Sequence, residues 1–167
     1  AALDAGLPVT MIERDAESIA RGRANVEKVY NALVAKGRMT EAAQAAVMAR
    51  YTGSTDYADI AQVDLVIEAV FEDIEVKKAV FRELDRVCKP GAVLATNTSY
   101  LDIDAIAAAT GRPQDVIGLH FFSPANIMKL LEIVVPAKVA PDVVATAFEL
   151  ALSLIHISEP TRPERIS

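Results

Sequence analysis

Short apolar segments alternate with amphipathic helical segments along most of this chain. The segments VDLVIEAV (residues 63–70) and GAVLATN (91–97) are almost continuously apolar, which is typical of strands buried on both faces of a parallel sheet. Between them, IEVKKAVFRELDRVC (74–88) has apolar residues at helical spacing. Strand, helix and strand repeated at this spacing predict a doubly wound, mostly parallel α/β sheet.

Further strands and helices complete the predicted order. The strands are expected at residues 6–13, 115–122 and 130–135, and the helices at 15–37, 40–50, 101–110 and 140–152. Asp15 or Ser18 is expected to cap the first of these helices, and Gly37 to end it. The segment YTGSTDY (51–57) is predicted to be a turn, and AALDAG (1–6) to be the last turns of a helix that stops at Gly6.

The overall composition excludes several classes of partner and site. The formal net charge is −6 and the pI about 4.9, without the clustered basic residues that nucleic-acid binding needs. No apolar run reaches the roughly 20 residues of a membrane-spanning helix. Cys88 is the only cysteine, which excludes an internal disulfide and a cysteine metal cluster. We expect Cys88 to be a packed thiol in a soluble protein of a reducing compartment.

Polar side chains follow the predicted strands at the point where each strand ends. In parallel α/β sheets, ligands bind at the carboxyl ends of the strands. Any one polar residue there is ordinary for a loop, but the agreement of all the strand ends indicates a ligand site. The residues in question, with the neighbours that belong to the same loops, are Glu13, Phe71, Glu72, Lys77, Asn97, Thr98, Ser99, His120 and Ser123.

Glu13 closes the strand predicted at residues 6–13. An acidic residue at this place in a dinucleotide-binding fold accepts hydrogen bonds from both hydroxyls of the adenine ribose and disfavours a 2′-phosphate. A helix-capping acid is the ordinary alternative. The chain contains no G-x-G-x-x-G phosphate loop that would strengthen the assignment.

His120 and Glu132 lie on two strands that we expect to be neighbours. A carboxylate that accepts from one imidazole nitrogen fixes the tautomer and stabilises the imidazolium formed when the other nitrogen takes a proton. The alternative is a buried histidine satisfied by a structural acid. Ser99 is either a turn cap or a hydroxyl that binds a substrate oxygen beside His120. A serine hydrolase is excluded because no G-x-S-x-G exists, and no metal-ligand spacing is present.

Four segments together resemble the NAD-binding domain of the 3-hydroxyacyl-CoA dehydrogenases. They are GLPVTMIERD (6–15), VDLVIEAVFEDIEVKKAVF (63–81), ATNTSYLDIDAIAA (95–108) and VIGLHFFSPANIMKLLEIV (116–134). The resemblance covers about residues 1–150 and is strongest to the dehydrogenase part of multifunctional fatty-acid oxidation enzymes, which carry a fused enoyl-CoA hydratase. It implies a Rossmann-like fold and NAD as the cofactor.

The resemblance also implies a role for each matched residue. His120 corresponds to the catalytic base, Glu132 to its carboxylate partner, and Ser99 to the serine that touches substrate and nicotinamide. Glu13 corresponds to the ribose-binding acid. Ser123 stands where many members have Asn, and Lys36 lies near a coenzyme A contact of some members. The remaining implied cofactor contacts are Val70, Phe71, Glu72, Lys77 and Asn97.

The implied reaction is the oxidation of (3S)-3-hydroxyacyl-CoA to 3-oxoacyl-CoA in fatty-acid β-oxidation. The alternatives are a non-catalytic NAD-binding or structural relative and a dehydrogenase of short hydroxy acids. The expected partners of the parent enzyme are acyl-CoA and further subunits, either in a homo-oligomer or in a β-oxidation complex. The expected location is the bacterial cytoplasm, or the mitochondrial or peroxisomal matrix in a eukaryote.

Both ends of the chain differ from the family pattern. Residues 1–151 are predicted to be a partial NAD-binding domain, because the first strand, its glycine loop and the following helical domain of the family are not in the sequence. Residues 152–167 are predicted to be a non-native tail, since they are similar to the translation of a common sequencing-library adapter. We therefore expect the 167-residue chain to be inactive by itself.

Overall fold

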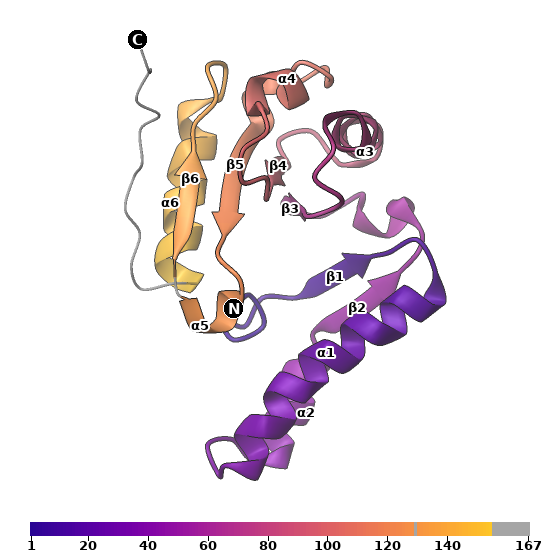
Figure 1. Ribbon diagram of the computed structural model, residues 1–167, viewed down its shortest axis with the longest axis vertical. Coiled ribbons are helices and arrows are strands. Elements are labelled where there is room, and N and C mark those ends of the chain that lie inside the picture. Colours follow the sequence, from indigo (N-terminus) through magenta and orange to yellow (C-terminus); the bar gives the residue numbers. More distant parts are fainter. Residues whose placement is uncertain (129, 155–167) are drawn as a thin grey trace. The chain divides into compact units, whose positions relative to one another are not determined.

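A computed structural model describes residues 1–128 and 130–154 of the chain (Figure 1). These residues divide into two compact units, Ala1–Ile60 and the part that begins at Ala61. The predicted tail lies outside the described residues from residue 155 onward. Its first three residues belong to the last helix, which continues to Leu154, so helical structure extends past the predicted boundary at residue 151.

The first unit is a two-stranded parallel sheet with two helices. Strands β1 (Val9–Ile12) and β2 (Tyr51–Ser54) pair in parallel, and between them run helices α1 (Ala16–Ala35) and α2 (Glu41–Met48), with a 3-10 turn at Tyr57–Ile60 after β2. The prediction of a turn at residues 51–57 was wrong for 51–54. Gly53 suggested a turn, but a side chain there would collide with Ile19 of α1, so the glycine serves close helix–strand packing.

Local capping explains where the helices of the first unit begin. Asp15 Oδ1 accepts from the Ser18 N–H at 2.7 Å, which decides between the two predicted caps, and Thr40 Oγ1 accepts from the Ala43 N–H at 3.1 Å. Residues 1–6 form turns. The Gly6 N–H donates to Leu3 O and the Leu7 N–H to Ala2 O, the two bonds of a Schellman motif, with Gly6 at φ +82°. The predicted stop at Gly6 is confirmed.

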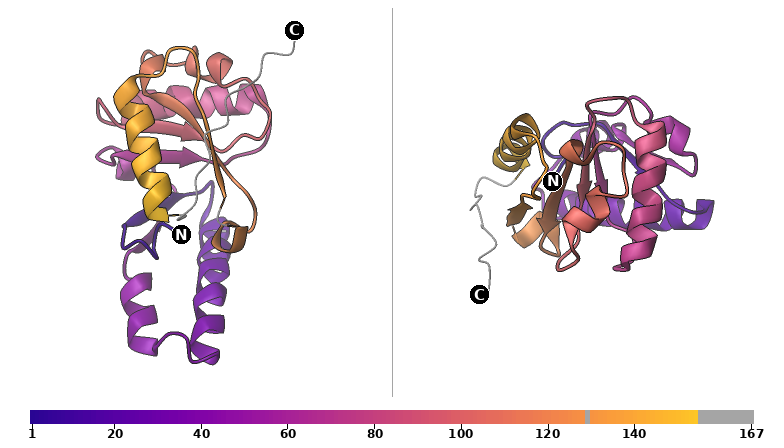
Figure 2. Two further views of the ribbon diagram at one scale, coloured as in Figure 1. Left: turned by 90° about the vertical axis from the view of Figure 1, so that its left-hand side faces the viewer. Right: turned by 90° about the horizontal axis from the view of Figure 1, so that it is seen from above.

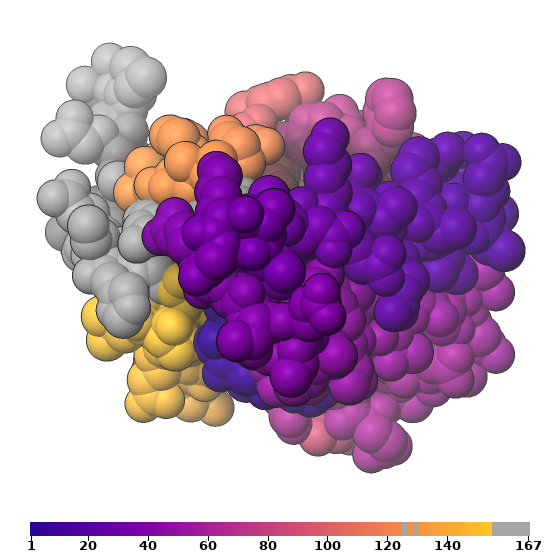
Figure 3. All heavy atoms as spheres, turned by 90° about the horizontal axis from the view of Figure 1, so that it is seen from below, coloured from indigo at the N-terminus to yellow at the C-terminus, as the bar shows by residue number. Residues whose placement is uncertain are grey.

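The core of the first unit is small, and its helices are mostly exposed. Leu3, Tyr30, Met48 and Tyr51 are the buried residues of its apolar cluster. The outer surfaces of α1 and α2 are visible in indigo and purple in Figure 3. This unit is therefore held by one sheet face against one side of α1 and α2.

The second unit contains a four-stranded sheet in the order β3–β4–β5–β6. The first three strands are parallel and β6 is antiparallel to β5, which confirms a mostly parallel sheet. The described residues thus form two sheets where one was predicted. The elements are β3 (Leu65–Glu68), α3 (Ile74–Val87), β4 (Val93–Thr96), α4 (Ile103–Ala107), a 3-10 turn (Pro113–Asp115), β5 (Val116–Phe121), α5 (Ala125–Met128), β6 (Leu131–Val134) and α6 (Pro141–Leu154).

Helices cover both faces of this second sheet (Figures 1 and 2). Val143, Ala147 and Ala151 of α6 pack on one face in a continuous apolar cluster. The other face is covered by α3 and α4, and Gly118 of β5 permits the close approach of Ile103. Cys88 is buried at the end of α3, and burial raises the pKa of its thiol, so the predicted packed thiol is confirmed.

The described part of the chain has no helix that is both long and apolar enough to cross a membrane.

Candidate active site

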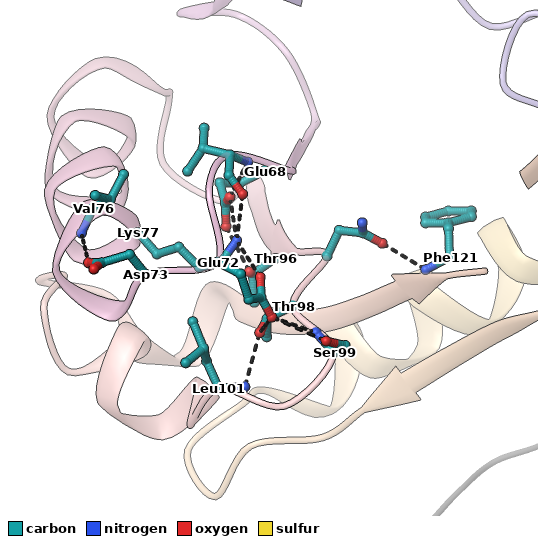
Figure 4. A network of polar contacts seen from close by, with 12 residues as sticks. Glu68, Glu72, Asp73, Val76, Lys77, Thr96, Thr98, Ser99, Leu101 and Phe121 are labelled. Carbon is teal, nitrogen blue, oxygen red and sulfur yellow. Dashed lines mark hydrogen bonds and ion pairs between the residues drawn. The ribbon is translucent and has the colours of Figure 1, made fainter. Parts of the chain in front are cut away.

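The parallel strands β3, β4 and β5 end at one edge of the four-stranded sheet, and polar side chains gather there. Glu68 ends β3, Thr96 ends β4, and His120 is the penultimate residue of β5. The backbone links the ends of β3 and β4 directly, because the Asn97 N–H donates to Glu68 O at 2.8 Å. The edge therefore brings residues from distant parts of the sequence into one network (Figure 4).

His120 and Glu132 form the pair that the sequence predicted. They are directly opposite each other in the antiparallel register of β5 and β6, and His120 Nδ1 lies 2.8 Å from Glu132 Oε2. The side chains are 18% and 34% exposed, so both can be reached from solvent. With Nδ1–H donating to the carboxylate, the neutral ring presents Nε2 as its proton acceptor. The Phe122 ring, 4.7 Å away between centroids, packs against the imidazole.

Asn97 connects the loop after β4 to the strand that holds His120. Its Oδ1 accepts from the Phe121 N–H at 2.7 Å, next to His120 in the sequence. The side-chain oxygen is thus occupied within the protein. A ligand contact from Asn97, as the sequence predicted, would come from its amide NH₂ group.

Glu72 organises the loop that contains Ser99. Its Oε1 accepts from the Thr98 hydroxyl and from the Ser99 N–H at 2.9 Å, and it lies 3.4 Å from Ser99 Oγ. Burial acts to raise the pKa of Glu72, but these hydrogen bonds and the Lys77 ammonium outweigh it, so the pKa lies below its usual value. Glu72 is therefore a charged acceptor that fixes the backbone at Ser99.

Lys77 and Glu68 form a buried ion pair behind this loop. Lys77 Nζ lies 2.8 Å from Glu68 Oε1, and each side chain is only 1% exposed. Lys77 was predicted to be a cofactor contact, and no role was predicted for Glu68. The signal for Glu68 was present, since it is the one charged residue within the apolar strand Leu65–Glu68. The signal for burial of Lys77 was its position one helical turn before Phe81, on the buried side of α3.

Large apolar side chains lie exposed beside these polar groups. Phe71 is 86% exposed and Tyr100 is 74% exposed, and Val70 is exposed as well. Phe71 and Tyr100 flank Glu72 and Ser99 in the sequence. Apolar surface beside a few polar groups is the usual composition of a cofactor site. These exposed apolar residues and their polar neighbours therefore have the composition that a nicotinamide cofactor needs.

The other predicted site residues lie elsewhere in the chain. Glu13 follows β1 in the first unit, where its N–H donates to Ser54 O at 3.0 Å. Lys36 caps the C-terminus of α1 through its own N–H, and its side chain is exposed. Ser123 is exposed in the loop after β5. No three His, Cys, Asp or Glu side chains within residues 1–128 and 130–154 are placed to hold a metal ion.

Parallel strands whose carboxyl ends carry polar side chains, among them a histidine paired with a carboxylate, are typical of α/β proteins that bind a ligand at this edge. The family described as 3-hydroxyacyl-CoA dehydrogenase, NAD binding domain, matches residues 1–157. The chain belongs to this family, and NAD is the cofactor that the family's domain binds.

Individual relatives agree with the family. The chain is 44% identical over 153 residues to the peroxisomal bifunctional enzyme of Cavia porcellus, covering 92% of this chain and 21% of the relative. It is 40% identical over 149 residues to 3-hydroxybutyryl-CoA dehydrogenase of Clostridioides difficile, covering 89% and 53%. The chain thus spans about a fifth to about half the length of these relatives.

Solved structures share the fold. The crystal structure of FadB2 from M. tuberculosis superposes with a TM-score of 0.90 at 38% identity, covering 96% of this chain and 58% of that one. The structure of 3-hydroxybutyryl-CoA dehydrogenase from Escherichia coli gives a TM-score of 0.88 at 40% identity, covering 92% and 32%. The predicted Rossmann-like fold is confirmed.

Proposed function

We propose that the protein to which this chain belongs oxidises (3S)-3-hydroxyacyl-CoA to 3-oxoacyl-CoA. The observation that supports it best is the His120–Glu132 pair, 2.8 Å between Nδ1 and Oε2, at the carboxyl edge of the sheet. His120 Nε2 accepts the proton of the substrate hydroxyl, and Glu132 stabilises the imidazolium that results. Bound NAD supplies the hydride acceptor. The Ser99 hydroxyl donates to the substrate oxygen and holds it beside His120.

The remaining predicted residues bind and orient. The carboxylate of Glu13 would accept from the hydroxyls of the adenine ribose. Exposed Val70 and Phe71 would cover apolar surface of the cofactor, and Lys36 would contact coenzyme A. Further cofactor contacts are proposed for Glu72, Asn97 and Ser123.

The wider assignment rests on the relatives' names. Peroxisomal bifunctional enzymes and bacterial 3-hydroxybutyryl-CoA dehydrogenase are both among them. We propose a role in fatty-acid β-oxidation, with acyl-CoA as substrate and with other domains or subunits as partners. The location would be the bacterial cytoplasm or, in a eukaryote, the matrix of peroxisomes or mitochondria.

Substrate class is tested with the protein expressed from its complete reading frame. Reduction of acetoacetyl-CoA by NADH is compared with oxidation of short hydroxy acids by NAD, at equal enzyme concentration. The proposal expects turnover of the CoA thioester and little turnover of the free acids. Preferential turnover of the free acids would contradict it and favour a dehydrogenase of short hydroxy acids.

The 167-residue chain alone is proposed to be inactive. It contains no G-x-G-x-x-G segment to place backbone N–H groups and a helix N-terminus at the pyrophosphate. NADH titration of the purified chain, followed by fluorescence, should show no saturation. Cooperative unfolding together with NADH binding at concentrations on the order of 1–10 μM, far tighter than weak millimolar association, would contradict the proposal.

A further inference from the structure

We infer that Glu68 and Lys77 are positioning residues that act through Glu72 on Ser99. The inference rests on the proposed function, in which Ser99 binds the substrate oxygen. It assigns Lys77 an indirect role in place of a direct cofactor contact, and it gives Glu68 a role that no motif indicated.

The Lys77 ammonium is surrounded by oxygen atoms of the protein. Its Nζ lies 2.8 Å from Glu68 Oε1, 3.3 Å from Glu72 Oε2 and 3.3 Å from Val70 O. An ammonium has three N–H donors, so these three acceptors match its capacity. Because the side chain is 1% exposed, its charge is directed into this network and not toward a ligand in solvent.

Glu68 is held as firmly as Lys77. Its Oε1 also accepts from the Val70 N–H at 2.6 Å, and its Oε2 accepts from Thr96 Oγ1 at 2.7 Å. These bonds join the end of β3 to the end of β4 and to the turn that leads into α3 (Figure 4). Glu68 therefore gives Lys77 a fixed partner, and Lys77 cannot swing away from Glu72.

The two oxygens of Glu72 point in different directions. Oε2 faces the Lys77 ammonium at 3.3 Å, whereas Oε1 accepts from the Thr98 hydroxyl and the Ser99 N–H. Glu72 is partly exposed, with 30% of its side chain accessible, so burial alone does not fix its rotamer. The ammonium supplies the second contact that orients the carboxylate and, through it, the backbone at Ser99.

A role in stability alone explains this arrangement poorly. Both residues have apolar neighbours in their own elements, since Glu68 ends an apolar strand and Lys77 lies on the face of α3 that buries Phe81 and Leu84. Removing two charges from water costs about as much as their attraction returns, and apolar replacement of a buried pair is often neutral or stabilising. A charged pair at apolar positions is therefore explained by the orientation it imposes on its neighbours.

The test uses Glu68→Gln/Lys77→Met in the protein expressed from its complete reading frame. The double variant removes both charges, so no unpaired charge is left buried. The Gln oxygen can still accept from the Val70 N–H, and its NH₂ group can donate to the Thr96 hydroxyl, which then acts as an acceptor. Two readouts are measured: kcat and KM for acetoacetyl-CoA, and amide hydrogen exchange of residues 97–102 without cofactor. The expected result is faster exchange of this segment and a loss in kcat of up to about 100-fold, the scale of a small misplacement at an active site.

Comparison with Glu72→Gln tests whether the pair acts through Glu72. Glu72→Gln leaves the Glu68–Lys77 pair intact, so we expect this variant to fold even where the double variant does not. The amides of residues 97–102 should also exchange faster in Glu72→Gln. Adding Glu68→Gln/Lys77→Met to Glu72→Gln should cause no further loss of kcat. Multiplicative losses would overturn the inference, because the pair would then act by another route.

The matched control is Arg112→Met, which removes a buried cation at the other end of α3. It should lower stability but leave kcat and the exchange of residues 97–102 unchanged. Unchanged kcat and exchange in Glu68→Gln/Lys77→Met would overturn the inference. Failure of the wild-type protein to act on 3-hydroxyacyl-CoA would instead refute the proposed function, and the exchange measurement would still decide whether the pair positions Ser99.

Discussion

Helix α3 has a buried cation at each end, and the two cations have different surroundings. Lys77 lies in the first turn, and its partners lead through Glu72 to Ser99. Arg112 lies at the other end, where it donates to Lys89 O at 2.7 Å, Cys88 O at 3.2 Å and Leu84 O at 3.3 Å. Arg112 thus caps the last carbonyls of the helix and pairs with Asp85 and Asp115, and none of these groups is a predicted site residue.

The environment of Arg112 has features that could be mistaken for a site. Its Nε lies 3.0 Å from Asp85 Oδ1, close enough for an ion pair although the angle is not that of a hydrogen bond. A pocket of about 400 Å³ opens beside it, lined also by Cys88 and Gln114. Burial raises the pKa of Asp115 nearby, partly offset by the Arg112 charge. None of the predicted site residues lines this pocket. A buried charge beside a pocket therefore does not by itself indicate catalysis. The groups that the charge contacts through hydrogen bonds and ion pairs must be considered as well.

The largest effect on stability is expected at Arg112. Arg112→Met removes the cap of α3 and leaves Asp85 and Asp115 without their cation, so the free energy of unfolding should fall by about 4 kcal/mol. Urea denaturation of the complete protein measures this loss. A loss of kcat in Arg112→Met, in addition to the loss of stability, would contradict the proposed difference between the two ends of α3.

At the N-terminal end of α3, a smaller difference in stability is expected between the single and the double substitution. Lys77→Met alone leaves Glu68 charged and buried, which should cost about 3 kcal/mol, whereas Glu68→Gln/Lys77→Met should recover most of that loss. Denaturation midpoints of the two variants test the difference. A double variant less stable than the single one would show that the pair contributes net stability, contrary to the positioning role.

The smallest effect concerns pH. The pKa of Glu72 is lower in the folded protein than its usual value of 4.5, so its contribution to stability is complete above about pH 4.5 and is lost as pH falls through the folded pKa. The difference in unfolding free energy between wild type and Glu72→Gln should therefore shrink as the solution is acidified from neutral pH. A difference that stays constant with pH would contradict the assigned charge on Glu72.

The sequence predicted the fold well where local signals agree. Asp15 and Thr40 cap the helices that were expected to follow them, and β5 and β6 pair so that His120 meets Glu132. Strand β2 was not predicted because glycine is common in turns. At position 53 the glycine has another role, since a larger side chain there would collide with Ile19. Such a contact depends on how α1 packs on the sheet, and local sequence does not encode it.

The sequence predicted that polar residues would gather at the carboxyl edge of the sheet, but not the contacts that each of them makes (Figure 4). Glu72, Lys77 and Ser99 were all expected to face a ligand, whereas Lys77 points inward to Glu68. A polar residue at a strand end or in a first helical turn can face either way, and tertiary contacts decide which. For Lys77, the sequence indicated burial through its apolar neighbours Phe81 and Leu84, which lie on the same side of α3.

We propose above all that His120, oriented by Glu132, is the base of a 3-hydroxyacyl-CoA dehydrogenase. The most direct measurement is kcat of His120→Gln in the complete protein, together with its dissociation constant for NADH. We predict a loss of kcat of about 10²- to 10⁴-fold with NADH binding unchanged, because only proton transfer is removed. Near-normal turnover in that variant would contradict the claim and leave only the fold assignment standing.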